Sequence, residues 1–160
     1  MSGRMLMATL LLAVPLFAIP ASADTPDFSG NWQIDTAQSR QPEDRNLSLE
    51  ITQNGSGITF VRTYEEGGRG QDITSKFTCA PGGTSCNFDE NGHKATVSLW
   101  YNGPELVILK TNGPKRDPTV EWHMKLDPSG NTLTVTRENM APDGRSEKLV
   151  FHKTGAVASK

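Results

Sequence analysis

The stretch FSGNWQID, residues 28–35, decides the fold that we expect for this chain. Phe28, Trp32 and Ile34 fall on one phase of a strand, and Gly30 lies between the two aromatic residues. A glycine at this position lets another part of the chain approach the backbone closely. We therefore expect Trp32 to be a large buried anchor whose indole N–H needs one partner.

The residues that follow this strand predict a short turn. Asp35 is followed three residues later by Gln38, which is the spacing of a capping box at the start of a helix. We expect one short helical turn over residues 35–40. Together with the first strand, this turn would plug the base of a sheet.

The first 23 residues have the features of a cleavable signal peptide. Arg4 gives a positive start, residues 5–19 are almost entirely apolar, and Ala21, Ser22 and Ala23 form a small-residue cleavage site. A membrane anchor is the alternative, but the apolar run is short for a span and no stop-transfer charges follow it. The sequence therefore predicts a periplasmic or secreted protein, cleaved after Ala23.

The size and charge of the mature chain limit its function. Removal of 23 of the 160 residues leaves 137, enough for one domain with a substantial core, which we place at residues 24–153. The leader holds one of the 16 basic residues and none of the 18 acidic ones, so the mature net charge is −3. Such a chain has no electrostatic reason to bind nucleic acid or anionic lipid. Residues 154–160 have little to bury, and we expect a loose tail.

The two cysteines, Cys79 and Cys86, predict a disulfide. Export to an oxidising compartment favours the bond, and residues 80–85 between them are rich in turn-forming residues. A closed loop this short would stabilise the fold by roughly 2–3 kcal/mol on the loop-entropy model. A redox or metal pair is the alternative, but the spacing is not C-x-x-C and the chain has no other cysteine.

From residue 46 onward, apolar and polar residues alternate with a period of two, and Gly, Asn, Asp and Pro turns separate the segments. The strands that we expect after the first are residues 46–53, 58–65, 71–79, 87–90, 95–101, 105–111, 120–126, 131–138 and 145–153. Short strands joined as consecutive hairpins favour an all-β fold, an antiparallel up-and-down β-barrel of about eight to ten strands, because closure removes the sheet edges. A β-sandwich is the alternative.

The opening run also resembles a known family. The pattern F-x-G-x-W-x-x-D-x-x-x-S begins small exported bacterial proteins of the lipocalin-like, calycin-type family, and its positions here are Phe28, Gly30, Trp32, Asp35 and Ser39. The resemblance implies a barrel and, as the family habit, a small ligand inside it. Lipocalins also carry a later Thr-Asp-Tyr-like marker and a C-terminal helix, and neither is found in this sequence. They place an arginine on the tryptophan, a role for which Arg137 and Arg145 are the candidates.

Two arginines are the leading candidates for a ligand site. Arg62 continues the phase of Phe60, and Arg137 continues the phase of Val135. If the apolar residues face inward, both guanidinium groups reach the barrel interior, where their planar forks suit a carboxylate or a phosphate. The other residues that we expect in the site are Tyr64, Phe77, Trp100, Tyr101, Trp122 and Met124. This set predicts a pocket for a small hydrophobic or acidic amphiphilic ligand, such as a fatty acid.

Each of these assignments has a simpler alternative. The arginines could lie at strand ends with their heads at the rim, or pair with Glu65, Glu66 or Glu138. The aromatic residues could simply fill the core, as they do in small barrels. The chain would then be a filled barrel that acts as a structural or protein-interaction module of the cell envelope.

No pattern in the sequence predicts catalysis, a metal or a cofactor. His93, His123 and His152 are scattered, without the spacing of metal ligands, and we expect His123 to be exposed because it lies opposite the phase of Trp122. No serine lies in a G-x-S-x-G context, and no cysteine–histidine pair stands out. We therefore expect a binding protein and not an enzyme.

Overall fold

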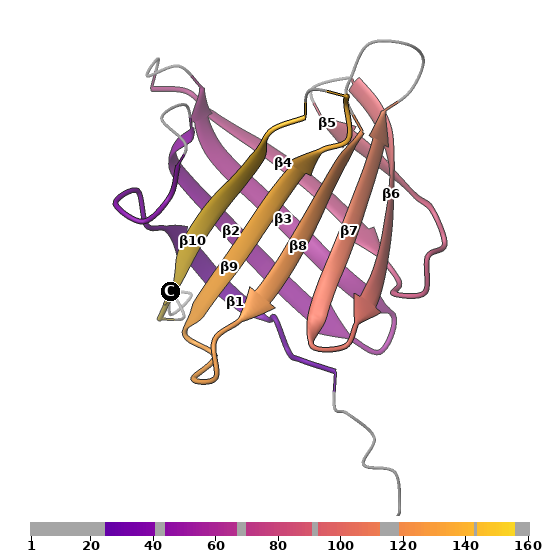
Figure 1. Cartoon of the computed structure of the whole chain (residues 1–160), viewed down its shortest axis with the longest axis horizontal. Helices are drawn as coiled ribbons and strands as arrows, with labels where there is room; N and C mark the ends of the chain where they lie inside the picture. Colours follow the sequence, from indigo (N-terminus) through magenta and orange to yellow (C-terminus); the bar gives the residue numbers. More distant parts are fainter. Residues whose placement is uncertain are drawn as a thin grey trace, which may run out of the picture.

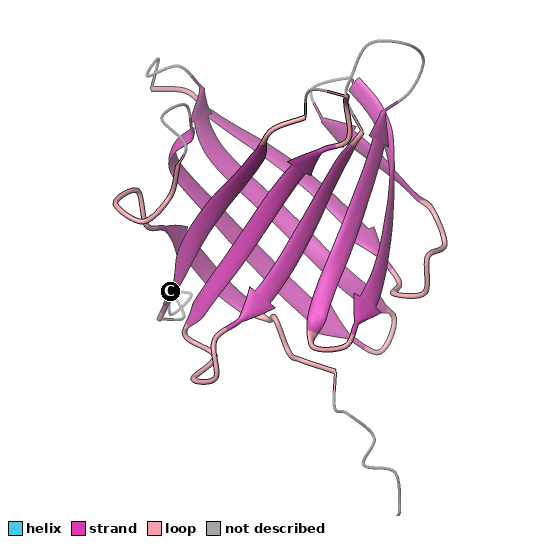
Figure 2. Cartoon of the chain, viewed as in Figure 1, coloured by secondary structure: helices cyan, strands magenta, loops and turns pink. Residues whose placement is uncertain are grey.

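The computed structural model describes residues 25–40, 44–66, 70–90, 93–112, 119–142 and 144–155 of the chain. This part of the chain consists of strands and loops and contains no helix (Figure 2). It accordingly holds no helical segment that is long and apolar enough to cross a bilayer. The expected signal peptide and residues 156–160 of the expected tail lie outside the described residues.

Across these residues, ten antiparallel strands form one closed barrel (Figure 1). Each strand pairs with its neighbour in sequence, and β1 lies between β10 and β2, so that the first and last strands close the sheet. The prediction of an all-β up-and-down barrel is confirmed, and the alternative of a sandwich is wrong. The strands are β1 Gly30–Ile34, β2 Asp44–Asn54, β3 Gly57–Glu66, β4 Asp72–Cys79, β5 Cys86–Glu90, β6 His93–Asn102, β7 Glu105–Asn112, β8 Val120–Leu126, β9 Thr132–Asn139 and β10 Ser146–Thr154.

One end of the barrel is filled by the residues of the opening motif. Phe28 is 0% and Trp32 is 1% exposed, and Trp32 Nε1 donates to the carbonyl oxygen of Phe28 at 3.0 Å. The side chain of Gln53 holds the segment before β1, because it accepts from the N–H of Phe28 and donates to the carbonyl oxygen of Pro26, both at 3.3 Å. Trp32 is thus the buried anchor that the sequence predicts, and its one donor is satisfied.

The turn after β1 ties the motif to the last strand. Asp35 Oδ1 accepts from the N–H groups of Ala37 and Gln38 at 2.9 and 3.1 Å, and the Gln38 amide donates to Asp35 Oδ2 at 2.7 Å. The expected cap is therefore present, but the residues that it caps form a turn and not the predicted helical turn. The chain instead runs onto β10, where the hydroxyl of Ser39 accepts from the N–H of Val150 at 2.9 Å.

The cation that packs on Trp32 is Lys153. The pairing of β1 with β10 places Lys153 opposite Trp32, and Lys153 Nζ lies 5.2 Å from the centre of the indole ring. Neither Arg137 nor Arg145 takes this place. Arg137 points into the other half of the barrel interior, and Arg145 is exposed in the loop before β10.

The predicted disulfide between Cys79 and Cys86 is formed, with the Cα atoms 5.7 Å apart. It joins the end of β4 to the start of β5, two strands that share one registered residue pair among the described residues. β5 is short and covers only part of β6. The loop between the cysteines lies beside the rest of β6, where Pro81 forms a bridge to Leu99. There the N–H groups of Gly82 and Gly83 each donate to the carbonyl oxygen of Leu99 at 2.9 Å. The disulfide therefore holds a loop that completes the barrel wall.

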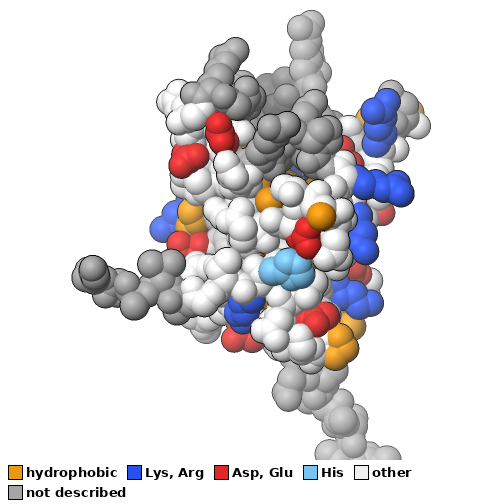
Figure 3. Space-filling model, turned by 90° about the vertical axis from the view of Figure 1, so that its left-hand side faces the viewer, with side chains coloured by type: hydrophobic (Ala, Val, Ile, Leu, Met, Phe, Trp, Pro, Cys, Tyr) orange, Lys and Arg blue, Asp and Glu red, His pale blue; other side chains and the backbone are white. Residues whose placement is uncertain are grey.

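The outer wall is polar on the face that Figure 3 shows. Acidic and basic side chains are interspersed there, and hydrophobic side chains appear as isolated spots. Strand alternation accounts for this pattern, because the apolar phase of each strand points to the interior.

Candidate ligand-binding pocket

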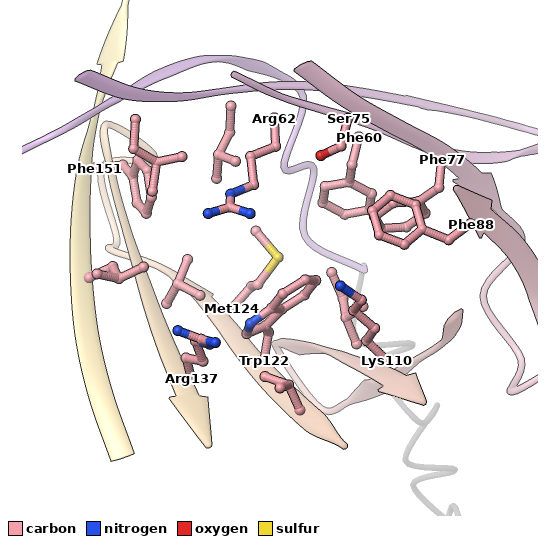
Figure 4. A pocket seen from close by; sticks show the side chains of 16 residues that line it. Phe60, Arg62, Ser75, Phe77, Phe88, Lys110, Trp122, Met124, Arg137 and Phe151 are labelled. Atoms are coloured by element: carbon pink, nitrogen blue, oxygen red, sulfur yellow. The ribbon is translucent and has the colours of Figure 1, made fainter. Parts of the chain in front are cut away.

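The half of the interior away from Trp32 contains a pocket of about 200 Å³ (Figure 4). Its lining side chains come from β2 to β5 and from β7 to β10, and all are apolar except Arg62, Ser75, Lys110 and Arg137. None of the lining residues carries a carboxylate. The apolar members are Leu47, Leu49, Phe60, Phe77, Phe88, Ile108, Val120, Trp122, Met124, Val135, Leu149 and Phe151.

A row of three phenylalanines forms one wall of the pocket. Phe60 and Phe77 are directly opposite in the pairing of β3 with β4, and their rings stack with centroids 4.9 Å apart and an interplanar angle of 22°. Phe88 on β5 meets Phe77 edge-on, at 5.4 Å and 80°. The row follows from three adjacent strands that each place a phenylalanine on the inward phase.

Arg62 is the basic residue nearest the middle of the lining side chains. Figure 4 shows its guanidinium between Phe151 on one side and the phenylalanine row on the other. Its carbon Cζ lies 4.2 Å from the centre of the Tyr64 ring, a cation–π contact. The strand pairing puts Arg62 opposite Ser75, which is 5% exposed. The expectation that the inward phase of β3 carries this guanidinium into the interior matches the geometry.

Arg137 enters the pocket from β9, on the opposite wall. Its Nη1 lies 3.1 Å from Glu147 Oε2, because β9 and β10 pair these two residues directly. The side chain of Arg137 is 38% exposed, so the ion pair lies at the rim. The sequence suggested a partner for the arginines among Glu65, Glu66 and Glu138, whereas Arg137 pairs with Glu147. That pairing depends on strand register, which the sequence alone does not specify.

Lys110 is a pocket residue that sequence reasoning missed. It lies on β7 in the phase of Leu106 and Ile108, and its Nζ is 5.1 Å from the centre of the Phe88 ring. The apolar run from Leu106 to Leu109 concealed the alternation of this strand. The signal was nevertheless present, because the spacing of two that links Leu106 to Ile108 reaches Lys110 next.

The remaining predicted residues divide into two groups. Phe77, Trp122 and Met124 line the pocket. Trp100 does not, because Leu99 takes the inward position on β6 and the next side chain must then point outward. Tyr64 contacts Arg62 but is not among the lining residues.

Tyr101 lies on the inward phase of β6, but it is away from the pocket. Its hydroxyl is buried and forms no hydrogen bond with the described part of the chain. Burial raises the pKa of the Tyr101 phenol, an effect that the nearby Gln53 side chain partly opposes and the Asp27 carboxylate reinforces. Tyr101 is therefore part of the filled end of the barrel.

The histidines and carboxylates form no metal centre within the described ranges, where no three potential ligands come together. His123 lies on the outward phase of β8 and is 25% exposed. Its Nε2 is 3.1 Å from Glu121 Oε1, and its Nδ1 is 3.6 Å from Glu105 Oε1. This polar group is separated from the pocket by the barrel wall.

Comparison with known proteins supports the fold. No family model matches the chain, and no curated protein does. Among solved structures, the REP1-NXSQ fatty acid transporter superposes with a TM-score of 0.55 at 7% identity, covering 80% of this chain and 96% of that one. Secretory abundant heat soluble protein 4 from Ramazzottius varieornatus superposes with a TM-score of 0.56 at 13% identity, covering 80% and 95%. At these identities the likeness shows the barrel fold alone.

Proposed function

We propose that this protein binds a small hydrophobic or acidic amphiphilic molecule inside the barrel. The observation that carries the proposal is the lining of the pocket, which combines apolar walls with three basic side chains and no carboxylate. Apolar surface gains about 25 cal/mol for each Å² removed from water, which favours a hydrophobic body. The basic side chains favour an anionic head on that body.

Arg62 is the residue that we propose as the main partner of the head group. Its guanidinium lies among the apolar side chains, whereas Arg137 is at the rim. Inside an apolar pocket the attraction between a guanidinium and a carboxylate is screened less than at the surface. The name of one structural neighbour, a fatty acid transporter, agrees with a ligand of this kind.

We also propose that the protein acts after export, in the periplasm or outside the cell. The leader-like first 23 residues support this location, and the disulfide agrees with an oxidising compartment. A binding role, and not catalysis, is the function that we assign to the pocket. Apart from Ser75 and the three basic side chains, its lining is apolar, which suits the binding of a hydrophobic body.

The test is ligand binding by protein purified without detergent. Native mass spectrometry would detect a co-purified molecule, and decanoate should displace the fluorescent anion 1-anilinonaphthalene-8-sulfonate from the stripped protein. Arg62→Met, which removes the charge and keeps an unbranched side chain, should weaken decanoate binding by about tenfold or more. Lys125→Met is the matched control, because Lys125 is exposed on the outward phase of β8. Absence of any bound species, together with no displacement, would contradict the proposal.

A further inference from the structure

The volume of the pocket restricts the size of the ligand. At about 200 Å³ it is smaller than the roughly 300–1,000 Å³ of pockets that enclose drug-sized molecules. An apolar cavity of about 150 Å³ holds one benzene molecule. The space in this barrel therefore suits a body of one or two rings, and a long acyl chain would extend beyond it into solvent.

The shape of one wall indicates what kind of body fits. Phe60, Phe77 and Phe88 alternate between stacked and edge-on contacts along three adjacent strands. A further ring placed against this row would add an aromatic pair of the same geometry. Such pairs contribute about two- to tenfold in affinity beyond the apolar area that they bury.

The charges of the lining indicate the head group. Arg62, Lys110 and Arg137 place three basic side chains in the lining, and Arg137 forms an ion pair with Glu147 at the rim. Figure 4 shows Arg62 beside the phenylalanine row, so a ring against the row would place its substituent within reach of the guanidinium. A single carboxylate on a compact ring matches this arrangement.

We infer that the ligand class of this pocket is a compact aromatic carboxylate, whose ring extends the Phe60–Phe77–Phe88 row and whose carboxylate meets Arg62. This inference rests on the proposed function, because it names the ligand of the same pocket. It differs from the general proposal in two respects. The hydrophobic body is a ring system, and a long-chain fatty acid fits less well than its apolar area would suggest.

The experiment compares ligands on the unmodified mature protein by isothermal titration, so that no variant has to fold. The probes are 2-naphthoate, its saturated analogue decahydro-2-naphthoate, the neutral 2-naphthamide, decanoate and palmitate. We expect 2-naphthoate to bind about two- to tenfold more tightly than the saturated analogue. It should bind about tenfold or more tightly than the neutral analogue. Palmitate should bind no more than about fourfold tighter than decanoate, although each additional buried CH₂ would contribute roughly fourfold.

The outcomes separate the two proposals. If affinity rises by about fourfold for each CH₂ from decanoate to palmitate, or if the saturated analogue equals 2-naphthoate, the aromatic class is wrong and the general proposal stands. If the neutral amide equals 2-naphthoate, the assignment of a carboxylate to Arg62 is wrong. If none of the five probes binds, both proposals fail.

In the same titrations, Phe88→Leu should reduce the advantage of 2-naphthoate over its saturated analogue. It should lower the affinity for 2-naphthoate more than the affinity for decanoate, because leucine keeps most of the apolar volume of phenylalanine but removes the ring. Phe151→Leu, on the other side of the pocket, is the matched control and should leave the ratio unchanged. An unchanged ratio in Phe88→Leu would contradict the role of the phenylalanine row.

Discussion

The carbon chain of Lys153 lies across the backbone at Gly30, so closely that a Cβ atom at Gly30 would be 2.5 Å from Lys153 Cε. The same lysine places its ammonium over the ring of Trp32. Gly30 also has a φ of +147°, a backbone conformation that side chains disfavour. The backbone conformation is therefore the main reason for a glycine in the opening motif, because the flexible end of the Lys153 side chain can move aside.

Replacing this glycine should destabilise the barrel. We expect Gly30→Ala to lower the free energy of unfolding by about 1–3 kcal/mol, measured by urea denaturation. Gly55→Ala is the matched control, since a Cβ at Gly55 meets nothing within 4 Å, and its effect should be near zero. The Lys153→Ala background separates the contact with the lysine from the backbone conformation. A full rescue there would mean that the lysine contact, and not the backbone, sets the cost.

Much of the fold could be predicted from the sequence because strand alternation is a local property. Phe60 and Arg62 are two positions apart in one strand, so alternation puts their side chains on the same face. Both side chains line the pocket inside the barrel. The same argument fails for Trp100, because Leu99 and Trp100 are both large and apolar and either could have faced inward. Alternation predicts a side only where the two phases differ in polarity.

The pairs across the sheet could not be predicted, because they depend on register. Lys153 on Trp32 and Glu147 on Arg137 each join positions in two strands that are brought together only when the barrel closes. The candidate partners chosen from sequence were those nearby along the chain. The family resemblance implied an arginine on the tryptophan, with Arg137 and Arg145 as candidates, whereas the cation over the Trp32 ring is Lys153.

The disulfide should matter for stability more than for the shape of the pocket. Cys79→Ser combined with Cys86→Ser is expected to lower the free energy of unfolding by about 2–3 kcal/mol, because the unfolded chain regains the entropy of an open loop. The loss should appear in urea denaturation at unchanged pH. Wild-type protein kept in a reductant is the control and should show the same loss. Equal stability of the oxidised and reduced proteins would contradict a stabilising role for the bond.

Stability at acid pH should depend on Asp35. Hydrogen bonds from His152 and Gln38 lower the pKa of the Asp35 carboxyl below its ordinary value of 3.8. The unfolded chain therefore takes up this proton first as the pH falls. The stabilisation by Asp35 is fully present above pH 3.8 and is lost below it, through the lowered pKa of the folded state.

Asp35→Asn isolates this effect, because asparagine retains the capping oxygen and does not titrate. Denaturation series from about pH 6 to about pH 2 should show that the difference in stability between wild type and variant shrinks as the pH falls. Asp72→Asn, an exposed residue at the start of β4, provides a comparison in the same pH range. A difference that is independent of pH would show that Asp35 contributes no proton-linked stability.

The fluorescence of Trp122 should respond to ligand binding, and the fluorescence of Trp100 should not. Trp122 lines the pocket, whereas Trp100 points outward from β6. We expect the change in intrinsic fluorescence on addition of decanoate to persist in Trp100→Phe and to be largely lost in Trp122→Phe. Phenylalanine retains most of the apolar volume, so both variants should fold, which circular dichroism would check. Loss of the signal in Trp100→Phe alone would place the ligand outside the interior.

Removing the hydroxyl of Tyr101 should stabilise the protein. This group is buried and has no partner in good hydrogen-bonding geometry, so the folded state carries a desolvation cost that the nearby Gln53 side chain offsets only in part. We expect Tyr101→Phe to raise the free energy of unfolding by about 1–2 kcal/mol near neutral pH.

Burial also raises the pKa of Tyr101 above its ordinary value of 10.0, so the unfolded chain loses this proton first as the pH rises. Wild-type stability therefore falls above pH 10.0, and the advantage of the variant should widen there in denaturation series. A destabilised variant, or an advantage that narrows at alkaline pH, would mean that the hydroxyl is hydrated or bonded in solution.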